Sequence, residues 1–407
     1  MRMNIYFSGI MGAGIGPLAI LSAKVGHRVF GSDKKTSLMT APLDELATTI
    51  EIGDQNGEFL AAMHHEHGID WFVHSSAIKD DHPELLQARE LGLKTSKRDQ
   101  LINAIITENN LKLLAIAGTH GKTTTTSMLI WCFRQLGVPV SFLNGTTLSF
   151  APPSDYQEGS RFFIYEADEF DRNFLHFHPF LALIPAITYD HPDIYPTEAD
   201  YRAAFDQFKS QSQHVISDLS PNPAITLLGA HNRQNATLVF DAIRLLLPDI
   251  EPAKIVTALN SFPGAGRRFE KIADNIYSDY AHHPNEVHAT LQLARELGQR
   301  TNQKIIAIYE PHQNMRQKLV MDKYPWAFTD ADQIIWLPTN LSRENSDEPP
   351  IPPATFVRQL QAAGKTAEAG ALDAALIAKI QALSRDHIVV LLSDTGLDAF
   401  ARAHLLQ

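Results

Sequence analysis

Apolar residues occur along this chain in short runs, separated by longer stretches in which they recur every three or four positions. The short runs are rich in Ile, Val, Leu, Phe and Tyr and predict β-strands, while the helical spacing predicts α-helices. We predict strands at 4–10, 28–33, 71–78, 111–118, 161–168, 180–188, 275–281, 304–312, 333–338 and 387–394. We predict helices at 16–26, 83–92, 97–106, 122–137 and 235–247. Alternating strands and helices indicate an α/β protein built on parallel sheets.

A chain of 407 residues is too long for one hydrophobic core and indicates several domains. The pattern of strands and helices divides into three blocks. We predict domains at 1–107, 108–262 and 263–407. The Pro/Gly-rich stretch NSFPGAGRRFE marks the second boundary, and the proline-rich segment 342–353 is predicted to be a polar surface loop.

Composition narrows the class of protein. A hydrophobic content of 44% with 20% charged residues is ordinary for a soluble protein, and 35 basic against 46 acidic side chains give a net charge of −11. This balance argues against nucleic-acid or membrane-surface binding. The single cysteine, Cys132, lies in an apolar helical stretch and predicts a reducing compartment. With neither signal-peptide features nor a long apolar segment, we expect a cytoplasmic location.

The stretch GTHGKTTTT predicts a phosphate-binding loop. Gly118 and Gly121 would let backbone N–H groups face a phosphate at a strand-to-helix junction. Lys122 would neutralise the terminal phosphates, and the Thr123 hydroxyl would bind Mg²⁺. The usual nucleotide loop has its first glycine where this chain has Ile116, so the loop is shortened. A structural turn with a chance lysine is the alternative.

Acidic residues follow the next predicted strand of the same block. Glu166, Asp168 and Glu169 offer oxygen ligands for a cation where a strand ends. Asp190 and His191 follow the strand after that. A solvated acidic turn and a structural histidine are the alternatives.

Amides and cations stand at the end of the middle block and at the start of the third. Asn232 and Asn235 lie at a predicted helix start, where they would cap the helix or contact an adenine edge. Arg267 and Arg268 follow glycines and suit a phosphate or carboxylate.

The third block carries histidines and an arginine just after strands. His282, His312 and Arg316 occupy such positions, which is where ligands bind in open α/β sheets.

The N-terminal block contains a weaker signal, GIMGAGIGPLA, with Gly14 and Gly16 opening a helix and Asp33 ending the next strand. This arrangement fits a dinucleotide, another phosphate-bearing ligand, or a tight turn only. The stretch MHHEHG at 63–68 is interpreted as a solvated helix end rather than a metal site.

Taken in order, GTHGKTTTT, EADE, DH, HNxxN, RRFE and DYAHHP closely resemble the Mur ligases of bacterial cell-wall synthesis, over nearly the whole chain. The resemblance implies a Rossmann-like UDP-sugar-binding domain, a central P-loop ATP-binding domain and a Rossmann-like amino-acid-binding domain. It implies an ATP- and Mg²⁺-dependent ligase that forms an amide through an acyl phosphate in peptidoglycan precursor synthesis. Its partners would be small molecules, with neither nucleic acid nor membrane, and it would be a monomer or homodimer.

The resemblance also implies residue roles, with Lys122, Glu166 and His191 catalytic. Mg²⁺ would be held by Thr123, Glu166 and His191. ATP would be bound by Gly118, Thr119, His120, Gly121, Lys122, Thr123, Thr124, Asn232, Asn235, Arg268 and Asp279. The UDP-sugar would be bound by Gly14, Gly16, Asp33 and Ser75, and the amino acid or carboxylate by His282, His312 and Arg316. Domain closure is expected to assemble the site, and His191 and a phosphate oxygen are both open as the base.

The substrate is not fixed by these motifs. GSD and SSAIKDDHPEL are most similar to members that join L-alanine to UDP-N-acetylmuramate. The motifs leave Gly and L-Ser open as alternative amine substrates. EADEFD, DHPDIY, IYEPHQNM and LLSDTGLDAF are closer to members that recycle the L-Ala-γ-D-Glu-meso-diaminopimelate tripeptide. Ala186 and Thr188 replace the family's usual Asn and Glu before DH, and the central block is short.

Two other classes of protein share parts of the pattern. A nucleotide switch or motor would use the Lys122 loop but leaves DYAHHP unexplained. A nicotinamide oxidoreductase would use the N-terminal glycines but leaves the Lys122 loop without a role.

Overall fold

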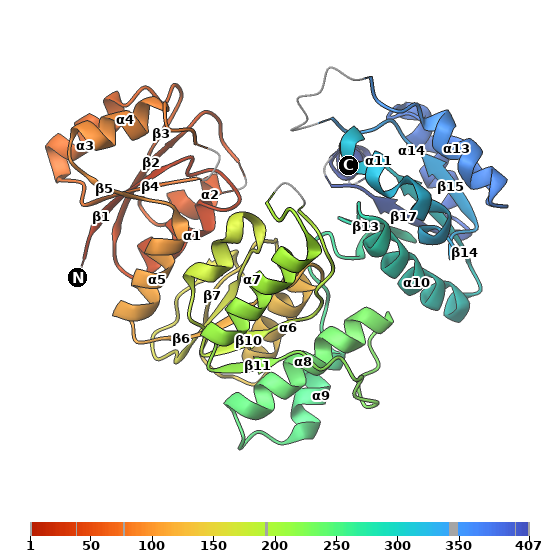
Figure 1. Ribbon diagram of the computed structural model, residues 1–407, viewed down its shortest axis with the longest axis horizontal. Coiled ribbons are helices and arrows are strands. Elements are labelled where there is room, and N and C mark those ends of the chain that lie inside the picture. The colour runs from red at the N-terminus through yellow and green to blue at the C-terminus, as the bar shows by residue number, and fades with distance from the viewer. Residues whose placement is uncertain are drawn as a thin grey trace. The chain divides into compact units, whose positions relative to one another are not determined.

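The computed structural model describes residues 2–37, 39–75, 78–191, 194–341, 349–394 and 396–405. Three sheets are present among them, one within each predicted block (Figure 1). The chain forms two compact units, residues 1–220 with 235–262, and residues 221–234 with 263–407. The first two predicted blocks therefore pack into one unit, and a short segment of the second block packs with the third. The boundaries at 107 and 262 remain predictions.

The N-terminal sheet has five parallel strands in the order β3-β2-β1-β4-β5. Its strands are β1 (Asn4–Ser8), β2 (Arg28–Asp33), β3 (Thr49–Ile52), β4 (Trp71–His74) and β5 (Lys94–Ser96). Its helices are α1 (Gly16–Lys24), α2 (Thr40–Asp44), α3 (Glu58–His67), α4 (Pro83–Glu90) and α5 (Arg98–Glu108). Successive side chains of β1 enter different cores, with Ile5 and Phe7 on one face and Tyr6 on the other. This alternation explains why the three central residues of the strand are all apolar.

The topology of this sheet places a candidate ligand site. The chain passes from β1 to β2 on one side, and β4 lies on the other side of β1. The loops after β1 and β4 therefore flank a topological switch point, where open α/β sheets bind ligands. Gly14 and Ser75 lie on these two loops.

The middle sheet has six strands in the order β11-β10-β6-β9-β7-β8, with only β8 antiparallel to its neighbour. Its strands are β6 (Lys112–Ile116), β7 (Ser141–Leu143), β8 (Ser154–Asp155), β9 (Phe162–Glu166), β10 (Leu181–Leu183) and β11 (His214–Ile216). Its helices are α6 (Lys122–Gln135), η1 (Phe170–His176), α7 (Glu198–Gln211), α8 (Ala230–Leu246) and α9 (Pro252–Asn260). Cys132 of α6 is fully buried, and burial raises the pKa of its thiol to about 12, as expected of a core residue.

The C-terminal sheet has the order β12-β13-β17-β14-β15-β16 and is parallel apart from β12. Its strands are β12 (Glu270–Ala273), β13 (Ile276–Asp279), β14 (Lys304–Tyr309), β15 (Gln333–Trp336), β16 (Ala367–Ala369) and β17 (His387–Leu392). Its helices are α10 (Pro284–Thr301), α11 (Asn314–Val320), η2 (Met321–Lys323), α12 (Tyr324–Ala327), α13 (Pro353–Ala362), α14 (Ala374–Leu383) and α15 (Gly396–Leu405).

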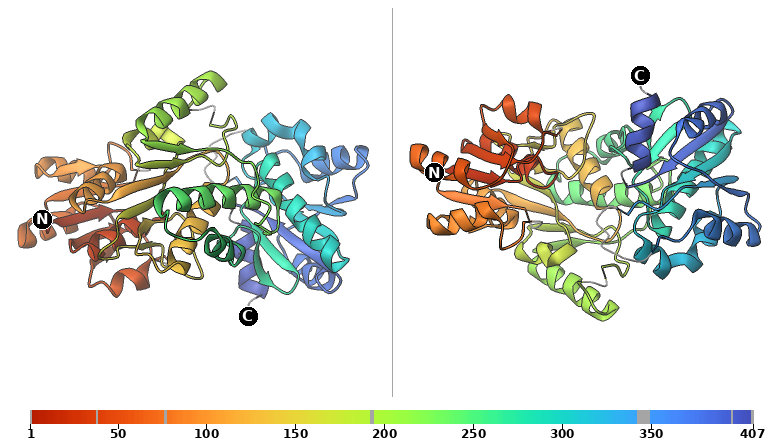
Figure 2. Two further views of the ribbon diagram at one scale, coloured as in Figure 1. Left: turned by 90° about the horizontal axis from the view of Figure 1, so that it is seen from below. Right: turned by 90° about the horizontal axis from the view of Figure 1, so that it is seen from above.

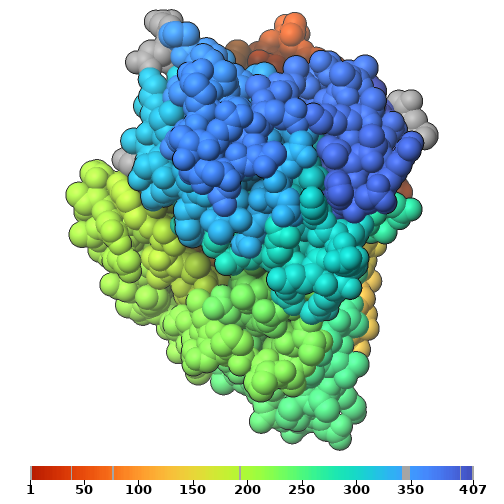
Figure 3. Space-filling view, turned by 90° about the vertical axis from the view of Figure 1, so that its right-hand side faces the viewer, coloured from red at the N-terminus to blue at the C-terminus, as the bar shows by residue number. Residues whose placement is uncertain are grey.

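Helices cover both faces of this sheet (Figure 2), and the chain from α13 onward forms the blue surface in Figure 3. Trp336 anchors one face, with Tyr309, Tyr324 and Phe356 against its ring.

The ten predicted strands all occur, several of them shorter than predicted. The prediction for 180–188 is too long, since β10 ends at Leu183 and Pro185 follows two residues later. The helix predicted from 235 begins at Ala230. The polar residues of that first turn hid its helical pattern. Most of the predicted loop 342–353 lies outside the described residues. None of the helices in the described parts of the chain combines the length and apolar character needed to cross a membrane.

Candidate active site

The loop between β6 and α6 requires its two glycines. Gly118 has φ 155° and Gly121 has φ 83°, a backbone region that disfavours side chains. A Cβ on Gly118 would lie 2.7 Å from the Ala186 carbonyl oxygen, and one on Gly121 would lie 2.9 Å from Oδ1 of Asn235. The loop is therefore pressed against two other segments of the middle domain.

Thr119 holds this loop to the segment after β10. Its hydroxyl donates to the Thr188 carbonyl at 2.7 Å and accepts the Thr188 N–H at 2.8 Å. The Tyr201 hydroxyl contacts the same oxygen at 2.7 Å, and the Thr119 N–H donates to the Ala186 carbonyl at 2.8 Å. Ala186 and Thr188 thus support the loop through backbone groups, and this support does not depend on the side chains at these two positions.

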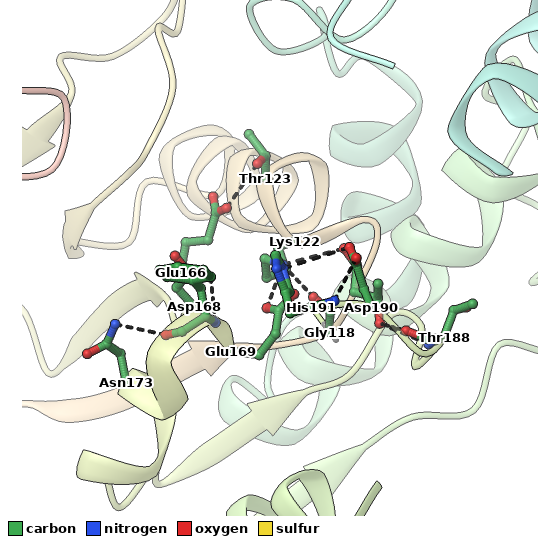
Figure 4. A network of polar contacts seen from close by, with 12 residues as sticks. Gly118, Lys122, Thr123, Glu166, Asp168, Glu169, Asn173, Thr188, Asp190 and His191 are labelled. Carbon is green, nitrogen blue, oxygen red and sulfur yellow. Dashed lines mark hydrogen bonds and ion pairs between the residues drawn. The ribbon is translucent and has the colours of Figure 1, made fainter. Parts of the chain in front are cut away.

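Lys122 lies at the first position of α6 and faces the acidic run. Its ammonium is 2.6 Å from Oε2 of Glu169 and donates to the Gly118 carbonyl at 2.6 Å (Figure 4). The two side chains are only 15% and 2% exposed. Burial opposes the charge on Lys122, but the carboxylates of Glu169, Asp168 and Glu166 outweigh it and raise the pKa of the lysine. The ammonium therefore stays charged at neutral pH.

Tyr195 and His191 lie against Glu169 and help to position it. The Tyr195 hydroxyl donates to the Glu169 backbone carbonyl at 2.6 Å. Nε2 of His191 lies 3.8 Å from Oε1 of Glu169 and 3.7 Å from Oδ2 of Asp190. His191 itself has φ 56°, and its N–H donates to the Asp190 carboxylate at 2.7 Å. A charged lysine, a carboxylate and an imidazole thus meet at one point beside the glycine loop.

Thr123 and Glu166 form a second polar pair at the start of α6. The Thr123 hydroxyl donates to Oε1 of Glu166 at 3.0 Å. Across the described residues, no group of three or more His, Cys, Asp or Glu side chains is arranged to hold a metal ion. Mg²⁺ usually binds through one or two protein ligands together with waters and substrate phosphates. The Thr123–Glu166 pair therefore fits Mg²⁺ delivered with a nucleotide, and does not form an all-protein metal cage.

Four further predicted nucleotide residues lie in the loop, in the first turn of α6 or near the start of α8. His120 and Thr124 are half-buried in the loop and the first turn of α6. Asn235 is 5% exposed and lies against Gly121, as the close approach to its Oδ1 shows. Asn232 is one turn earlier on α8 and donates to the Leu228 carbonyl at 3.0 Å.

Asp279 and Arg268 lie together in the C-terminal unit. The Asp279 carboxylate ends β13 and accepts the N–H groups of Phe269 at 2.8 Å and Ala281 at 2.9 Å. Burial raises the pKa of Asp279 to about 6, against the opposing effect of Arg268. The Arg268 guanidinium also lies over the Tyr280 ring, 5.4 Å from its centroid.

The C-terminal unit gathers a second polar cluster at the carboxyl ends of β14 and β17. Nδ1 of His312 lies 2.9 Å from Oδ2 of Asp394, and both side chains are largely buried. The ring of His282 is 5.9 Å from that of His312, and the His282 carbonyl accepts the Tyr309 hydroxyl at 2.7 Å. Arg316 is exposed on the neighbouring helix α11. The structure therefore brings His282 and His312 together and leaves Arg316 open to solvent.

The N-terminal glycine-rich turn is closely packed. A Cβ on Gly16 would lie 2.9 Å from the Ile10 carbonyl oxygen, and one on Gly14 would lie 3.0 Å from a guanidinium nitrogen of Arg98. The Asp33 carboxylate accepts the Met11 N–H at 2.9 Å, which ties the end of β2 to this turn. Ser75 lies half-buried just after β4.

Three residues at these sites have contacts that the sequence does not predict. Glu169 was seen only as one member of an acidic run, and its pairing with Lys122 depends on the fold. Asp394 lies in the stretch LLSDTGLDAF, which assigns it no role of its own, and Arg98 lies outside all of the motifs. Their contacts with His312 and Gly14 join segments more than 80 residues apart, so local sequence carries no signal for them.

Family models match three segments of this chain. They are the Mur ligase family catalytic domain at residues 4–109, the Mur ligase middle domain at 116–219 and the Mur ligase glutamate ligase domain at 267–394. The chain belongs to the Mur ligase family. It is therefore an enzyme of the ATP-dependent ligase class, as the motif order predicts.

Two named relatives are similar in sequence to most of this chain. The UDP-N-acetylmuramate–L-alanine ligase of Thermosynechococcus vestitus is 32% identical, over 81% of this chain and 80% of the relative. The enzyme of that name from Syntrophomonas wolfei is 30% identical, over 81% of each chain.

Solved structures share the fold. The UDP-N-acetylmuramate–alanine ligase of Thermotoga maritima has a TM-score of 0.79 at 23% identity, covering 100% of this chain and 99% of that one. A murein peptide ligase of Psychrobacter arcticus has a TM-score of 0.63 at 22% identity, covering 99% and 98%. These likenesses confirm the predicted three-part α/β fold of the family.

Proposed function

We propose that this protein joins L-alanine to UDP-N-acetylmuramate at the expense of ATP, in the synthesis of a peptidoglycan precursor. The observation that carries the proposal is the Lys122 loop. A charged, buried lysine lies between a glycine-shaped loop and the carboxylates of Glu169 and Glu166, in a chain about 30% identical to L-alanine ligases over four-fifths of its length.

The chemistry requires activation of a carboxylate, because a carboxylate is a poor electrophile. The sugar carboxylate attacks the γ-phosphate of ATP to give an acyl phosphate and ADP. The amine then attacks the acyl carbon, and inorganic phosphate leaves from the tetrahedral intermediate. Negative charge is spread over the transferred phosphoryl oxygens, so a fixed cation beside them lowers the barrier. Lys122 is that cation, and Glu169 fixes its direction.

Magnesium and the nucleotide are assigned to the residues around this loop. Thr123 and Glu166 would hold one Mg²⁺, and His191 with Glu166 would help to hold a second. When bound, Mg²⁺ neutralises phosphate charge and orients the phosphates. Asn232 and Asn235 would contact adenine, with further nucleotide contacts from Arg268 to a phosphate and from Asp279 to the ribose.

The other two substrates are assigned to the terminal domains. The UDP moiety would bind at Gly14, Gly16, Asp33 and Ser75, around the switch point of the N-terminal sheet. His282, His312 and Arg316 would meet the incoming amino acid or the reacting carboxylate.

A direct test offers one amine at a time. The protein is incubated with ATP, Mg²⁺ and UDP-N-acetylmuramate together with L-alanine, glycine, L-serine or the L-Ala-γ-D-Glu-meso-diaminopimelate tripeptide, and the products are weighed by mass spectrometry. The proposal predicts the L-alanine adduct at the highest kcat/KM. Preferential formation of the tripeptide adduct would instead establish a recycling ligase.

A further inference from the structure

An arginine outside every recognised motif lies on the N-terminal glycine-rich turn. Arg98 is the first residue of α5, and its Nη1 lies 3.0 Å from the position that a Cβ on Gly14 would occupy. Any side chain at position 14 would therefore press on the guanidinium. The lack of a side chain at Gly14 is what allows a cation to lie directly on this turn.

The other side of the same guanidinium faces the acidic run of the middle domain. Nη2 of Arg98 is 3.8 Å from Oδ2 of Asp168, too long for a hydrogen bond. The side chains are 30% and 40% exposed, so both groups are open to solvent. Oδ1 of Asp168 accepts the Phe170 N–H at 3.1 Å, which fixes the direction of the carboxylate. The guanidinium is thus held loosely on one side and retains donors for a ligand.

Contacts of α5 with the middle domain fix the position of Arg98 at the start of this helix. The Asp99 carboxylate lies 2.6 Å from Nδ1 of His176, and the Asn103 amide donates to the His176 carbonyl at 3.0 Å. The Lys97–Asp171 pair at 3.0 Å is exposed and adds little to this anchoring. The contacts of Asp99 and Asn103 with His176 thus hold the start of α5 and keep Arg98 over the turn, while the ion-pair partner that the described residues give Arg98 is the more distant Asp168.

A structural ion pair does not explain this geometry well. Exposed pairs contribute little even at ideal separation, and the Arg98–Asp168 pair is longer than that. A guanidinium presents five donors in a planar fork that matches phosphate oxygens. The adjacent turn leads into the N-terminus of α1, which favours anions.

We propose that Arg98 binds the diphosphate of the UDP-sugar on the glycine-rich turn, with Asp168 as a positioning residue for its guanidinium. This inference rests on the proposed function, because that function supplies the diphosphate ligand. Its physical basis is the joint placement of Gly14, Arg98 and Asp168.

The test compares Arg98→Ala with Lys97→Ala. The control removes the neighbouring cation of α5, which pairs with Asp171 and lies 46% exposed. Binding of UDP alone is measured by calorimetry, since UDP carries the diphosphate but lacks the sugar carboxylate. Loss of charged hydrogen bonds predicts a Kd for UDP raised about 10- to 100-fold in Arg98→Ala, with an unchanged KM for ATP. Lys97→Ala should bind UDP like the wild type.

A second variant covers the case in which Arg98→Ala does not fold. Arg98→Lys keeps the charge but loses the planar fork, so its Kd for UDP should lie between those of the wild type and the alanine variant. Wild-type affinity for UDP in both Arg98 variants would overturn the assignment. So would a loss confined to UDP-N-acetylmuramate, which would place Arg98 on the sugar carboxylate.

The two proposals fail in different ways. If the wild type binds UDP through Arg98 but forms no product with any amine, the proposed function fails and the Arg98 site stands. If product forms but UDP binding is indifferent to Arg98, only the Arg98 assignment fails.

Discussion

At the scale of single residues, the ammonium of Lys122 is held beside the glycine loop, and the proposed function places the developing phosphate charge there. Glu169 and the Gly118 carbonyl bind it at 2.6 Å each. A phosphate oxygen would compete with the Gly118 carbonyl for the same ammonium. Because Glu169 is 2% exposed, its carboxylate depends on Lys122 for compensation of its charge.

We predict that Lys122→Ala lowers turnover by at least about 10²–10³, since it removes a cation aimed at the transferred phosphoryl group. It should also lower the free energy of unfolding by about 3–5 kcal/mol, because Glu169 is left buried without its partner. Steady-state assays measure the change in turnover, and denaturant unfolding measures the change in the free energy of unfolding. The double variant Lys122→Met with Glu169→Gln separates them, since it should regain stability without regaining turnover. Near-normal ligation by either variant would contradict the assigned role.

His231 gives a prediction about pH. Loss of solvent around its half-buried ring, together with Arg233 and Arg268, lowers the pKa of this histidine to about 4. Between pH 6.5 and about 4, His231 is therefore protonated in the unfolded chain but neutral in the folded chain. The free energy of unfolding consequently decreases as the pH falls through this range. The loss is at most about 3 kcal/mol.

Calorimetric melting of the wild type and His231→Gln at pH 7.5 and 5 tests this linkage. The melting temperature should fall further between pH 7.5 and 5 in the wild type than in His231→Gln. His404→Gln, at an exposed position of α15, serves as the control and should follow the wild type. Identical pH dependence in the wild type and His231→Gln would show that His231 is not responsible.

At the scale of elements, the glycines at the two ends of α6 differ in what surrounds them. Gly121 before the helix and Gly137 after it have φ of 83° and 67°. A Cβ on Gly121 would meet Asn235 at 2.9 Å, whereas one on Gly137 would meet nothing within 4 Å.

Alanine at each position should therefore destabilise by a similar amount, about 1 kcal/mol, through backbone strain. Only Gly121→Ala should also displace the Asn235 amide, and so raise the KM for ATP. Melting temperatures and steady-state kinetics of the two variants check this. Equal KM values for ATP would show that the packing of Asn235 against the loop does not serve nucleotide binding.

The elements that the sequence predicts well are those whose signal is local. Buried central strands such as β6 and β14 are nearly continuous apolar runs, and the Lys122 loop is marked by glycine spacing. The short strands β3, β5, β11 and β16 have three or four residues each. They lie at or near sheet edges and gain their structure from pairing rather than from their own pattern. The contacts of Arg98 with Gly14 and of Asp394 with His312 likewise depend on topology.

At the scale of the whole molecule, the proposed function assigns one of three substrates to the polar loops at the end of each of the three sheets. Such a ligase should release phosphate from ATP appreciably only when UDP-N-acetylmuramate and L-alanine are both present. A nucleotide switch would hydrolyse ATP alone or with a partner protein. Coupled phosphate assays with each substrate omitted in turn distinguish the two classes. Full hydrolysis without the sugar nucleotide would contradict the ligase account.

The most direct test of the central claim follows oxygen from the sugar carboxylate. UDP-N-acetylmuramate labelled with ¹⁸O in its carboxylate is incubated with ATP, Mg²⁺ and L-alanine, and the released phosphate is analysed by mass spectrometry. Activation as an acyl phosphate predicts that one ¹⁸O passes to inorganic phosphate for each amide formed. Phosphate free of ¹⁸O while amide accumulates would contradict the account.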